Sequence, residues 1–424
     1  MTIEQLYSIF QQYPSVQTDT RSLKQGDIFF ALKGPNFNAN QFAEKALAAG
    51  AAYAVVDEAP ATPNERIIVV SDTLDTLQQL AKHHRQQFDI PFIAITGSNG
   101  KTTTKELVHA VLSTRFKTYT TYGNLNNHIG VPLTILRVQK DAQMAVIEMG
   151  ANHQQEIASY CAYTLPTHGI ITNAGKAHLE GFGGVEGVRK GKGELYDYLR
   201  ANNGTAFVMW DYDYLHTMSQ GLPHIIKYGT ANADVTGQLV QSEPFLSVAI
   251  TSDNAFTIQT QLVGAYNLPN VLVATAIGRH FGVDDQFIKK AIEQYAPSNS
   301  RSQLMERGDN KIILDAYNAN PSSMRAAIEN FAGIKADHKV LMLGAMAELG
   351  PESLDEHKQI VALLQQYPWD SVVLVGGDFL KIEHPFISKE NAVQAAEWFR
   401  QQDLHHTFFL IKGSRSMQME KVLA

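Results

Sequence analysis

The segment with the clearest chemistry is TGSNGKTT at Thr96–Thr103, which follows an apolar run at Pro91–Ile95. Its glycines would let backbone N–H groups converge on phosphate oxygens, and the start of a helix would add its positive dipole end. Lys101 would balance phosphate charge, and the Thr102 hydroxyl would coordinate Mg²⁺. The spacing is GxxGKT, shorter than the common GxxxxGKT. The sequence therefore predicts a nucleotide phosphate loop made of Gly97, Ser98, Asn99, Gly100, Lys101, Thr102 and Thr103.

Two further side chains could extend this loop into a magnesium site. Glu148 ends an apolar run, and α/β sheets place their ligand-binding groups at strand ends. A carboxylate on a neighbouring strand is the usual second Mg²⁺ holder beside a phosphate loop. Alone, however, Glu148 could be a solvated strand end and His178 a surface or core histidine. The basic cluster at Arg189–Leu195 has, by composition, the character of a solvated helix face.

These side chains need a scaffold, and the sequence has the pattern of an α/β protein. Short apolar runs alternate with helical periodicity, which is typical of parallel sheets with crossover helices. At about 100–200 residues per domain, 424 residues give two to four domains, and we expect three. A polar segment at 82–89 and the stretch 296–300 mark the expected boundaries. We predict units at 1–85, 86–298 and 299–424, the third of them doubly wound.

The elements themselves follow from the apolar runs and their flanking residues. Strands are expected at 28–32, 52–56, 67–70, 91–95, 145–147, 169–172, 206–209, 225–228, 312–314, 340–343, 372–375 and 408–411. Helices are expected at 40–49, after the phosphate loop, and at 323–331, 354–367 and 392–401.

Composition and charge restrict the class of protein. The formal net charge of −7 argues against a nucleic-acid or anionic-membrane surface as the main partner. The one cysteine, Cys161, can form neither an intramolecular disulfide nor a zinc cluster, which indicates a reducing compartment. The first 13 residues lack the pattern of a signal peptide, and no apolar stretch approaches the length of a membrane helix. We therefore expect a cytoplasmic enzyme without membrane insertion.

The GSNGKTTT loop resembles that of the Mur ligases, an ATP-dependent, amide-forming family that includes the folylpolyglutamate synthetases. The resemblance extends over nearly the whole chain. Its most specific part is DAYNANP at Asp315–Pro321, which is similar to the signature of the members that join D-alanyl-D-alanine to UDP-N-acetylmuramoyl-tripeptide. The resemblance implies a small α/β domain for the UDP-sugar, a central ATP-binding α/β domain of the P-loop type and a C-terminal Rossmann-like domain for the dipeptide.

For the metal site, the resemblance implies two Mg²⁺ ions held by Thr102, Glu148, His178 and Lys192. Lys192 matches a lysine that CO₂ carbamylates, which turns a cation into an anionic oxygen ligand. Carbamylation needs a neutral amine, so burial and nearby cations must depress the pKa of the lysine. Lys190 is the competing candidate, although it lies off the same helical face. The catalytic set implied is Lys101, His178, Lys192 and Arg301.

The resemblance also assigns binding residues in all three units. Asn267 and Asn270 approach the adenine, a role that is compatible with Asn267 also being a helix N-cap. Arg301 and Asp315 hold phosphate and ribose. The UDP-sugar is assigned to Thr20, Arg21 and Gly34. The muramoyl-peptide channel is assigned to Asn126, Asn127, Asn152 and His153, and the dipeptide to Asn318, Asn320, Lys412, Ser414 and Arg415.

The chain departs from the resemblance at one place, where LGAMAELG has Ala345 in the position of a common acidic residue. This chain must do without that carboxylate or use Glu348.

The implied reaction is an amide synthesis through an acyl phosphate, with ADP and phosphate released and the UDP-muramoyl-pentapeptide precursor of peptidoglycan formed. A diaminopimelate-, lysine- or glutamate-adding ligase of the same fold is the nearest alternative, and a non-catalytic nucleotide-binding protein is the more remote one. We expect a monomer without nucleic-acid partners. The sequence leaves open whether the third peptide residue is diaminopimelate or lysine.

Overall fold

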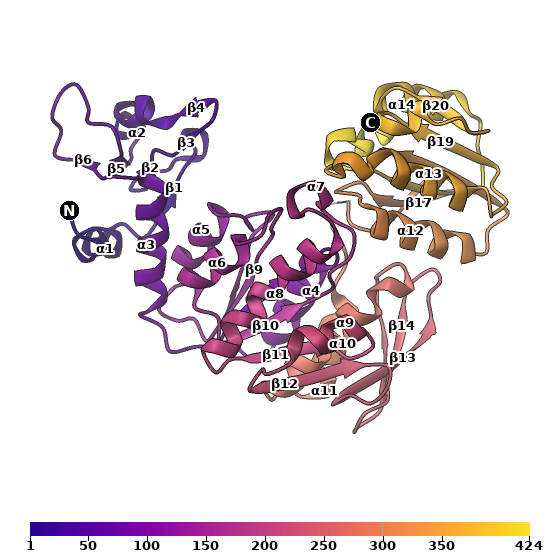
Figure 1. The fold of residues 1–424 in the computed structure, drawn as a ribbon, viewed down its shortest axis with the longest axis horizontal. Coiled ribbons are helices and arrows are strands. Elements are labelled where there is room, and N and C mark those ends of the chain that lie inside the picture. Colours follow the sequence, from indigo (N-terminus) through magenta and orange to yellow (C-terminus); the bar gives the residue numbers. More distant parts are fainter. Residues whose placement is uncertain (299) are drawn as a thin grey trace.

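The computed structural model describes residues 1–298 and 300–424, and their strands form three main sheets arranged in chain order (Figure 1). The N-terminal and C-terminal domains stand at opposite ends of the central domain and face each other across an open space. The predicted boundary between units two and three includes Asn299, which lies outside the described residues.

The N-terminal domain is a four-stranded parallel sheet in the order β1-β2-β5-β6 with helices on both faces. A short antiparallel ribbon of β3 and β4 projects from it. Phe29 and Ala54 face α2, whereas Ile28 and Val55 face α1 and α3. The elements are α1 (Ile3–Gln12), β1 (Val16–Gln17), β2 (Ile28–Phe30), β3 (Lys33–Gly34), β4 (Phe37–Asn38), α2 (Ala43–Ala48), β5 (Tyr53–Val56), β6 (Ile67–Val69) and α3 (Thr73–Arg85).

The segment 82–89, where the first boundary is predicted, begins with the last four residues of α3. Two of them, His84 and Arg85, are buried, and their polar atoms contact backbone carbonyls of the central domain. One sequence-based expectation for this domain needs correction. The predicted helix at 40–49 is a 3₁₀ turn followed by the short α2.

The central domain contains a nine-stranded sheet in the order β15-β14-β13-β12-β11-β10-β7-β9-β8. Strands β7 to β13 run parallel, and β13, β14 and β15 form an antiparallel edge that the apolar runs did not reveal. The five residues of β7 are all buried, as expected for a strand covered on both faces. The strands are β7 (Phe92–Thr96), β8 (Thr118–Thr120), β9 (Met144–Glu148), β10 (His168–Ile171), β11 (Thr205–Met209), β12 (His224–Gly229), β13 (Val235–Gln241), β14 (Ser247–Ile250) and β15 (Phe256–Gln259).

Helices cover this sheet, and α4 packs on α10 while α6 packs on α8. Helix α4 begins directly after the glycine loop, at the carboxyl end of β7. The helices are α4 (Lys101–Leu112), α5 (Gly130–Leu136), α6 (Glu156–Thr164), α7 (Leu179–Phe182), α8 (Val185–Ala201), α9 (Asp213–Ser219), α10 (Leu268–His280) and α11 (Asp285–Gln294).

The C-terminal domain has a six-stranded sheet in the order β16-β17-β21-β18-β19-β20, parallel except for β16. One face packs on α12 and α13 and the other on α14, so the domain is doubly wound as predicted. The elements are β16 (Gln303–Arg307), β17 (Asn310–Asp315), α12 (Pro321–Gly333), β18 (His338–Gly344), α13 (Ser353–Leu364), β19 (Ser371–Val375), β20 (Ile387–Lys389), α14 (Ala392–Gln401) and β21 (Thr407–Lys412).

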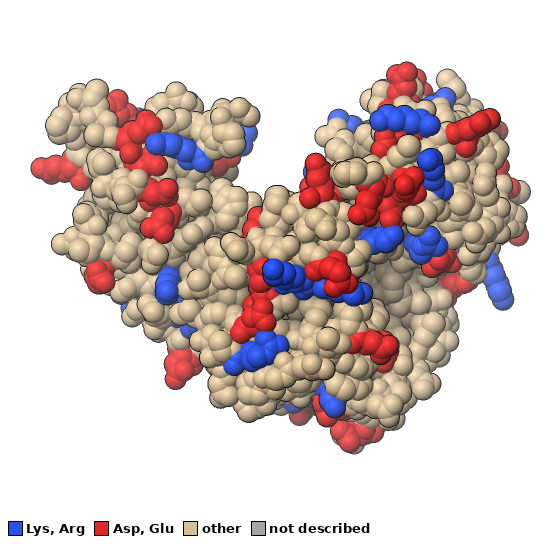
Figure 2. All heavy atoms as spheres, viewed as in Figure 1, with Lys and Arg blue, Asp and Glu red and all other residues tan. Residues whose placement is uncertain are grey.

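Across residues 1–298 and 300–424, none of the helices combines the length and the apolar character that crossing a bilayer requires. On the face shown in Figure 2, acidic and basic side chains are interspersed, and the surface is hollowed between the central and C-terminal domains.

Candidate active site

A cavity of about 1050 Å³ lies between the central and C-terminal domains. Its walls come from the phosphate loop, the ends of β9 and β10, the start of α10, and the segment from the end of β17 into α12. These are carboxyl ends of parallel strands and amino ends of helices, where open α/β sheets bind ligands. Predicted site residues that line it are Ser98, Asn99, Gly100, Lys101, Thr102, Thr103, Asn126, Asn127, Glu148, Asn152, His178, Asn267, Asn270, Arg301, Asp315, Asn318, Asn320 and Lys412.

The phosphate loop is held by the segment that follows β10. The Asn99 N–H donates to Asn173 Oδ1 over 3.0 Å, and Thr172 Oγ1 donates to the Asn99 carbonyl over 2.6 Å. Gly97 has φ +142°, and a Cβ there would lie 2.0 Å from Thr172 Oγ1. Only glycine fits so close to this segment. The loop therefore has a fixed shape before α4 begins.

Lys101 folds back over this loop. Its Nζ donates to the carbonyls of Gly97, over 2.6 Å, and Ser98, over 3.2 Å. Burial lowers the pKa of Lys101 to about 8, Glu148 acts in the opposite sense, and Arg301 adds to the lowering. The amine remains mostly charged at neutral pH, as a phosphate partner must be.

Glu148 has the geometry of a cation ligand. It ends β9, is 1% exposed, and its Oε1 accepts from Thr102 Oγ1 over 3.1 Å and from Asn126 Nδ2 over 2.7 Å. Its Oε2 is buried, and within the described part of the chain it has no hydrogen-bond partner. A buried carboxylate oxygen without a donor needs a compensating cation. Together with the adjacent Thr102 hydroxyl, this donor set suits Mg²⁺.

Lys192 lies on the buried side of α8, with 1% of its surface exposed, whereas Lys190 is exposed. The Lys192 Nζ donates to the Ala151 carbonyl over 2.9 Å and lies 4.9 Å from the centre of the Phe182 ring. Burial and, next, the charge of Lys101 hold the pKa of Lys192 well below its usual range. Such an amine can be neutral near physiological pH.

His178 contacts a residue of the C-terminal domain. Its Nδ1 lies 2.5 Å from Oε2 of Glu348, and the hydrogen bond from His178 lowers the pKa of that carboxyl. Glu348 is the acidic residue left in the LGAMAELG stretch. In this arrangement it pairs with His178.

The asparagines expected near the adenine are buried and bonded to each other. Asn270 Nδ2 donates to Asn267 Oδ1 over 2.8 Å, and Thr104 Oγ1 donates to Asn270 Oδ1 over 2.9 Å. The N-cap interpretation of Asn267 needs correction. Asn267 does precede α10, but its side chain makes no cap hydrogen bond and donates instead to the Val263 carbonyl.

At the end of β17, Asp315 is fixed by two neighbours. The Ser302 N–H donates to its Oδ1 over 2.9 Å, and Lys412 Nζ donates to its Oδ2 over 2.5 Å. Lys412 is 2% exposed and also donates to the Asn318 carbonyl. Arg301 lies with its guanidinium carbon 3.6 Å from the centre of the Tyr317 ring.

Several predicted site residues do not line the cavity. Gly97 opens the phosphate loop without lining the cavity, and His153 follows the lining residue Asn152 in the chain. The Ser414 hydroxyl is buried and donates to the Ala345 carbonyl, whereas Arg415 is exposed and pairs with Glu420. Three residues assigned to the UDP-sugar are in the N-terminal domain, outside the cavity: Thr20, Arg21 and Gly34.

Sequence reasoning missed the residues that hold the loop and join the two domains. Asn173 had a usable signal, because it directly follows a predicted strand. Lys176, Ser322 and Glu356 had none, since their contacts depend on how the domains pack. Lys176 Nζ lies 2.5 Å from Glu356 Oε1, and Lys176 N–H donates to Ser322 Oγ over 3.1 Å.

Comparisons with known proteins agree with this geometry. Family models match residues 12–85 (Mur ligase family, catalytic domain), 95–278 (Mur ligase middle domain) and 300–412 (Mur ligase, glutamate ligase domain). Two relatives are named UDP-N-acetylmuramoyl-tripeptide–D-alanyl-D-alanine ligase. The Bacillus subtilis protein is 34% identical over 96% of this chain and 92% of its own length, and the Escherichia coli protein is 36% identical with the same coverage.

Solved structures are similar over nearly the whole chain. MurF from Acinetobacter baumannii is 31% identical, with TM-score 0.89 over 100% of this chain and 97% of its own. MurF ligase from Thermotoga maritima in complex with ADP is 26% identical, with TM-score 0.86 over 96% of both chains.

Proposed function

This chain belongs to the Mur ligase family, and we propose that it joins D-alanyl-D-alanine to UDP-N-acetylmuramoyl-tripeptide at the expense of ATP. The product is the UDP-muramoyl-pentapeptide precursor of peptidoglycan, with ADP and phosphate released. The observation that carries the proposal is the meeting of the phosphate loop and the Asp315–Pro321 stretch in one cavity. Relatives of that activity, similar over nearly the full length, support the choice of substrates.

The proposed reaction has two steps, and in each of them a nucleophile must be held next to the atom that it attacks. The terminal carboxylate of the tripeptide attacks the γ-phosphorus of ATP, which forms an acyl phosphate and releases ADP. The dipeptide amine then attacks the acyl carbon, and the tetrahedral intermediate loses phosphate and a proton to give the amide. Lys101 and Arg301, from the two walls of the cavity, stabilise the charge on the transferring phosphoryl group.

The donor set at Glu148 and Thr102 would hold a Mg²⁺ ion, whose charge neutralises the nucleotide phosphates. We extend the proposal to a second ion, with His178 and a carbamate on Lys192 as further ligands. The buried, pKa-lowered amine of Lys192 suits carbamylation, in which the neutral nitrogen bonds the CO₂ carbon and a proton leaves. His178 would bind the metal through Nε2, because its Nδ1 is paired with Glu348, a partner that would orient the ring.

The finer assignments of substrates to domains belong to the same proposal. The N-terminal domain holds the UDP-sugar through Thr20, Arg21 and Gly34. Asn126, Asn127 and Asn152, which line the cavity, would contact the muramoyl-peptide. The C-terminal domain receives the dipeptide. We propose a cytoplasmic location, in keeping with the single, buried Cys161. We also propose that the protein is a monomer.

The decisive assay measures phosphate release from ATP with UDP-muramoyl-tripeptide, with and without D-alanyl-D-alanine. We expect release to require the dipeptide and the product to gain both alanines in a mass spectrum. Parallel reactions that supply shorter UDP-muramoyl-peptides with glutamate, lysine or diaminopimelate test the nearest alternative ligases. Phosphate release that ignores the dipeptide would refute the proposed function.

A further inference from the structure

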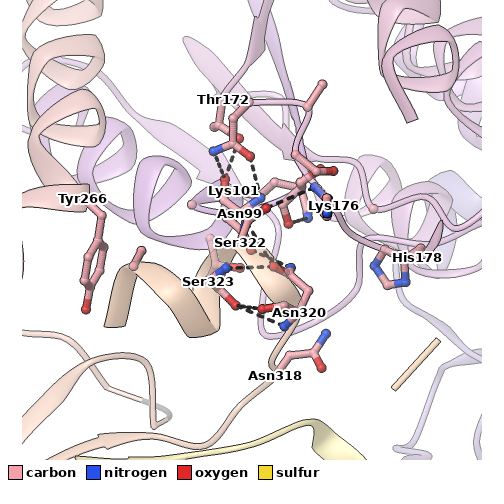
Figure 3. A pocket seen from close by; sticks show the side chains of 18 of the residues that line it. Asn99, Lys101, Thr172, Lys176, His178, Tyr266, Asn318, Asn320, Ser322 and Ser323 are labelled. Carbon is pink, nitrogen blue, oxygen red and sulfur yellow. Dashed lines mark hydrogen bonds between the residues drawn. The ribbon is translucent and has the colours of Figure 1, made fainter. Parts of the chain in front are cut away.

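A reciprocal pair of side-chain amides joins the phosphate loop to the C-terminal domain (Figure 3). Asn320 Nδ2 donates to Asn99 Oδ1 over 2.8 Å, and Asn99 Nδ2 faces Asn320 Oδ1 at 3.4 Å. Each carboxamide carries both donor and acceptor, so two asparagines can satisfy each other in this way. Asn320 is buried, which limits competition from water.

Each partner is held rigidly within its own domain. The backbone of Asn99 is bonded to Thr172 and Asn173, so its side chain projects from a fixed loop toward the C-terminal domain. Asn320 is the N-cap of α12, where its Oδ1 accepts from the Ser323 N–H over 2.9 Å. Contact between two fixed amides restricts how the loop and α12 can sit relative to each other.

A second contact lies beside this pair. Ser322, in the first turn of α12, accepts from the Lys176 N–H, and a Cβ on Gly175 would lie 2.9 Å from Ser322 Oγ. The start of α12 therefore packs closely on the segment that also supports the phosphate loop. In Figure 3, Asn99, Lys176, Ser322 and Asn320 lie together at this junction.

We propose that Asn320 is a positioning residue for nucleotide binding, acting through Asn99 to hold the phosphate loop and the C-terminal domain in one arrangement. Arg301 and Asp315 lie on that domain and line the same cavity as Lys101. The amide pair fixes the distance between the two walls that must both contact the nucleotide. The inference rests on the proposed function, in which the nucleotide spans these walls.

The test is a double-mutant cycle on ADP binding, measured by calorimetry on the full chain. Asn320→Ser keeps a side chain that can cap α12 but is too short to reach Asn99. Asn99→Ala removes the partner and leaves α12 unchanged. We expect each single variant to bind ADP about fivefold to tenfold more weakly, as for loss of one hydrogen-bonded pair. The double variant should bind ADP with about the same affinity as the single variant that binds ADP less tightly, because both substitutions remove the same contact.

Two controls distinguish the loss of the Asn99–Asn320 contact from a general loss of folded structure. Asn391→Ser makes the same substitution at the N-cap of α14, whose cap bonds to Val393 and Gln394 lie outside the cavity, and should bind ADP like wild type. Thermal unfolding of every variant reports whether the fold is intact. In steady-state kinetics, Asn320→Ser should raise the KM for ATP and leave the KM for the UDP-substrate unchanged.

The inference is overturned if Asn320→Ser binds ADP as tightly as wild type or more tightly. It is also overturned if the fold-loss of ADP affinity in the double variant equals the product of the fold-losses in the two single variants. ADP binding needs no ligation, so a failure of this inference can be distinguished from a failure of the proposed ligation. A coupled pair in a chain that releases phosphate without the dipeptide would keep this inference and refute the ligase.

Discussion

At the scale of single residues, the partly buried Lys101 and the buried Lys192 serve the proposed site in opposite protonation states. Lys101 must be a cation to face phosphates, whereas Lys192 must lose its proton before CO₂ can add. Burial lowers the pKa of both, and the charge of Lys101 is the second cause of the lowering at Lys192. The charge of Lys101 therefore favours the neutral amine of Lys192 that carbamylation needs.

Lys192→Gln tests the role of this amine. We expect kcat to fall by about 100-fold or more, because the change removes the nitrogen that carries the proposed metal ligand. A ¹³C carbamate signal from labelled bicarbonate should appear in the wild type and vanish in the variant. Lys190→Gln is the matched control, since Lys190 is exposed two residues earlier, and should keep both activity and signal. Full activity of Lys192→Gln, with or without added bicarbonate, contradicts the assignment.

His168 makes stability depend on pH at a place remote from the cavity. It begins β10 and packs against Phe207, Phe281 and His280. Burial, with His280 as a smaller cause, lowers the pKa of His168 to about 4 from 6.5. The unfolded chain therefore binds more protons between pH 6.5 and 4, and the free energy of unfolding falls as the pH falls through that window.

We expect His168 to account for about 3 kcal/mol of this loss, from a shift of about two and a half pKa units. Urea unfolding at several pH values between 4.5 and 7 should show a shallower pH dependence for His168→Gln than for wild type. His224→Gln alters an exposed histidine and should keep the wild-type slope. Equal slopes for wild type and His168→Gln would show that His168 is not the group that titrates.

At the scale of elements, the phosphate loop depends on the close approach of β7 and β10 at their carboxyl ends. The two strands pair in register up to Thr96 and Ile171, and the chain after each strand contacts the other. Gly97 sits where this contact is tightest. The strand pairing, more than the loop itself, sets the loop's shape.

Gly97→Ala tests that dependence. The added Cβ would meet Thr172 Oγ1 at a positive φ, so we expect a loss of about 3–5 kcal/mol in the free energy of unfolding. Gly183→Ala also has positive φ but open space around the new Cβ, and should cost only about 1–2 kcal/mol. Chemical denaturation of both variants measures the difference. If both substitutions cost the same, the approach to Thr172 is not what requires glycine.

At the scale of the whole molecule, the outer domains are placed on the central domain by different contacts. Arg85, at the end of α3, donates to the carbonyls of Thr164 and Leu165 and so links the N-terminal domain to the central domain. The contacts of the C-terminal domain at the cavity include the polar pair of Lys176 with Glu356. Polar interdomain contacts permit relative motion more readily than a large apolar interface does.

We therefore expect the outer domains to approach each other when substrates bind, because ligands on separate domains must meet at the phosphate loop. Small-angle scattering should show a smaller radius of gyration with an ATP analogue plus UDP-muramoyl-tripeptide than for the free chain. Either ligand alone should give a smaller change. Scattering curves that are unchanged with both ligands would contradict a closure of this kind.

The sequence by itself determined much of the framework. The apolar runs of the parallel strands and the glycine loop are local patterns, because a buried strand and a phosphate-binding turn each impose their residue types over a few positions. The doubly wound C-terminal domain and the position of Lys101 beside Thr102 follow from such patterns. The edge strands β13 to β15 were missed, since half-exposed strands carry polar residues and lack a continuous apolar run.

Only the tertiary structure decided which polar groups face each other. Asn99 and Asn320 are 221 residues apart, and His178 and Glu348 lie on different domains. Lys412 lines the cavity, and its Nζ donates to Asp315, which precedes it by 97 residues. Hydrogen bonds between distant segments leave no spacing in the sequence, because they depend on the packing of whole domains and not on the local chain.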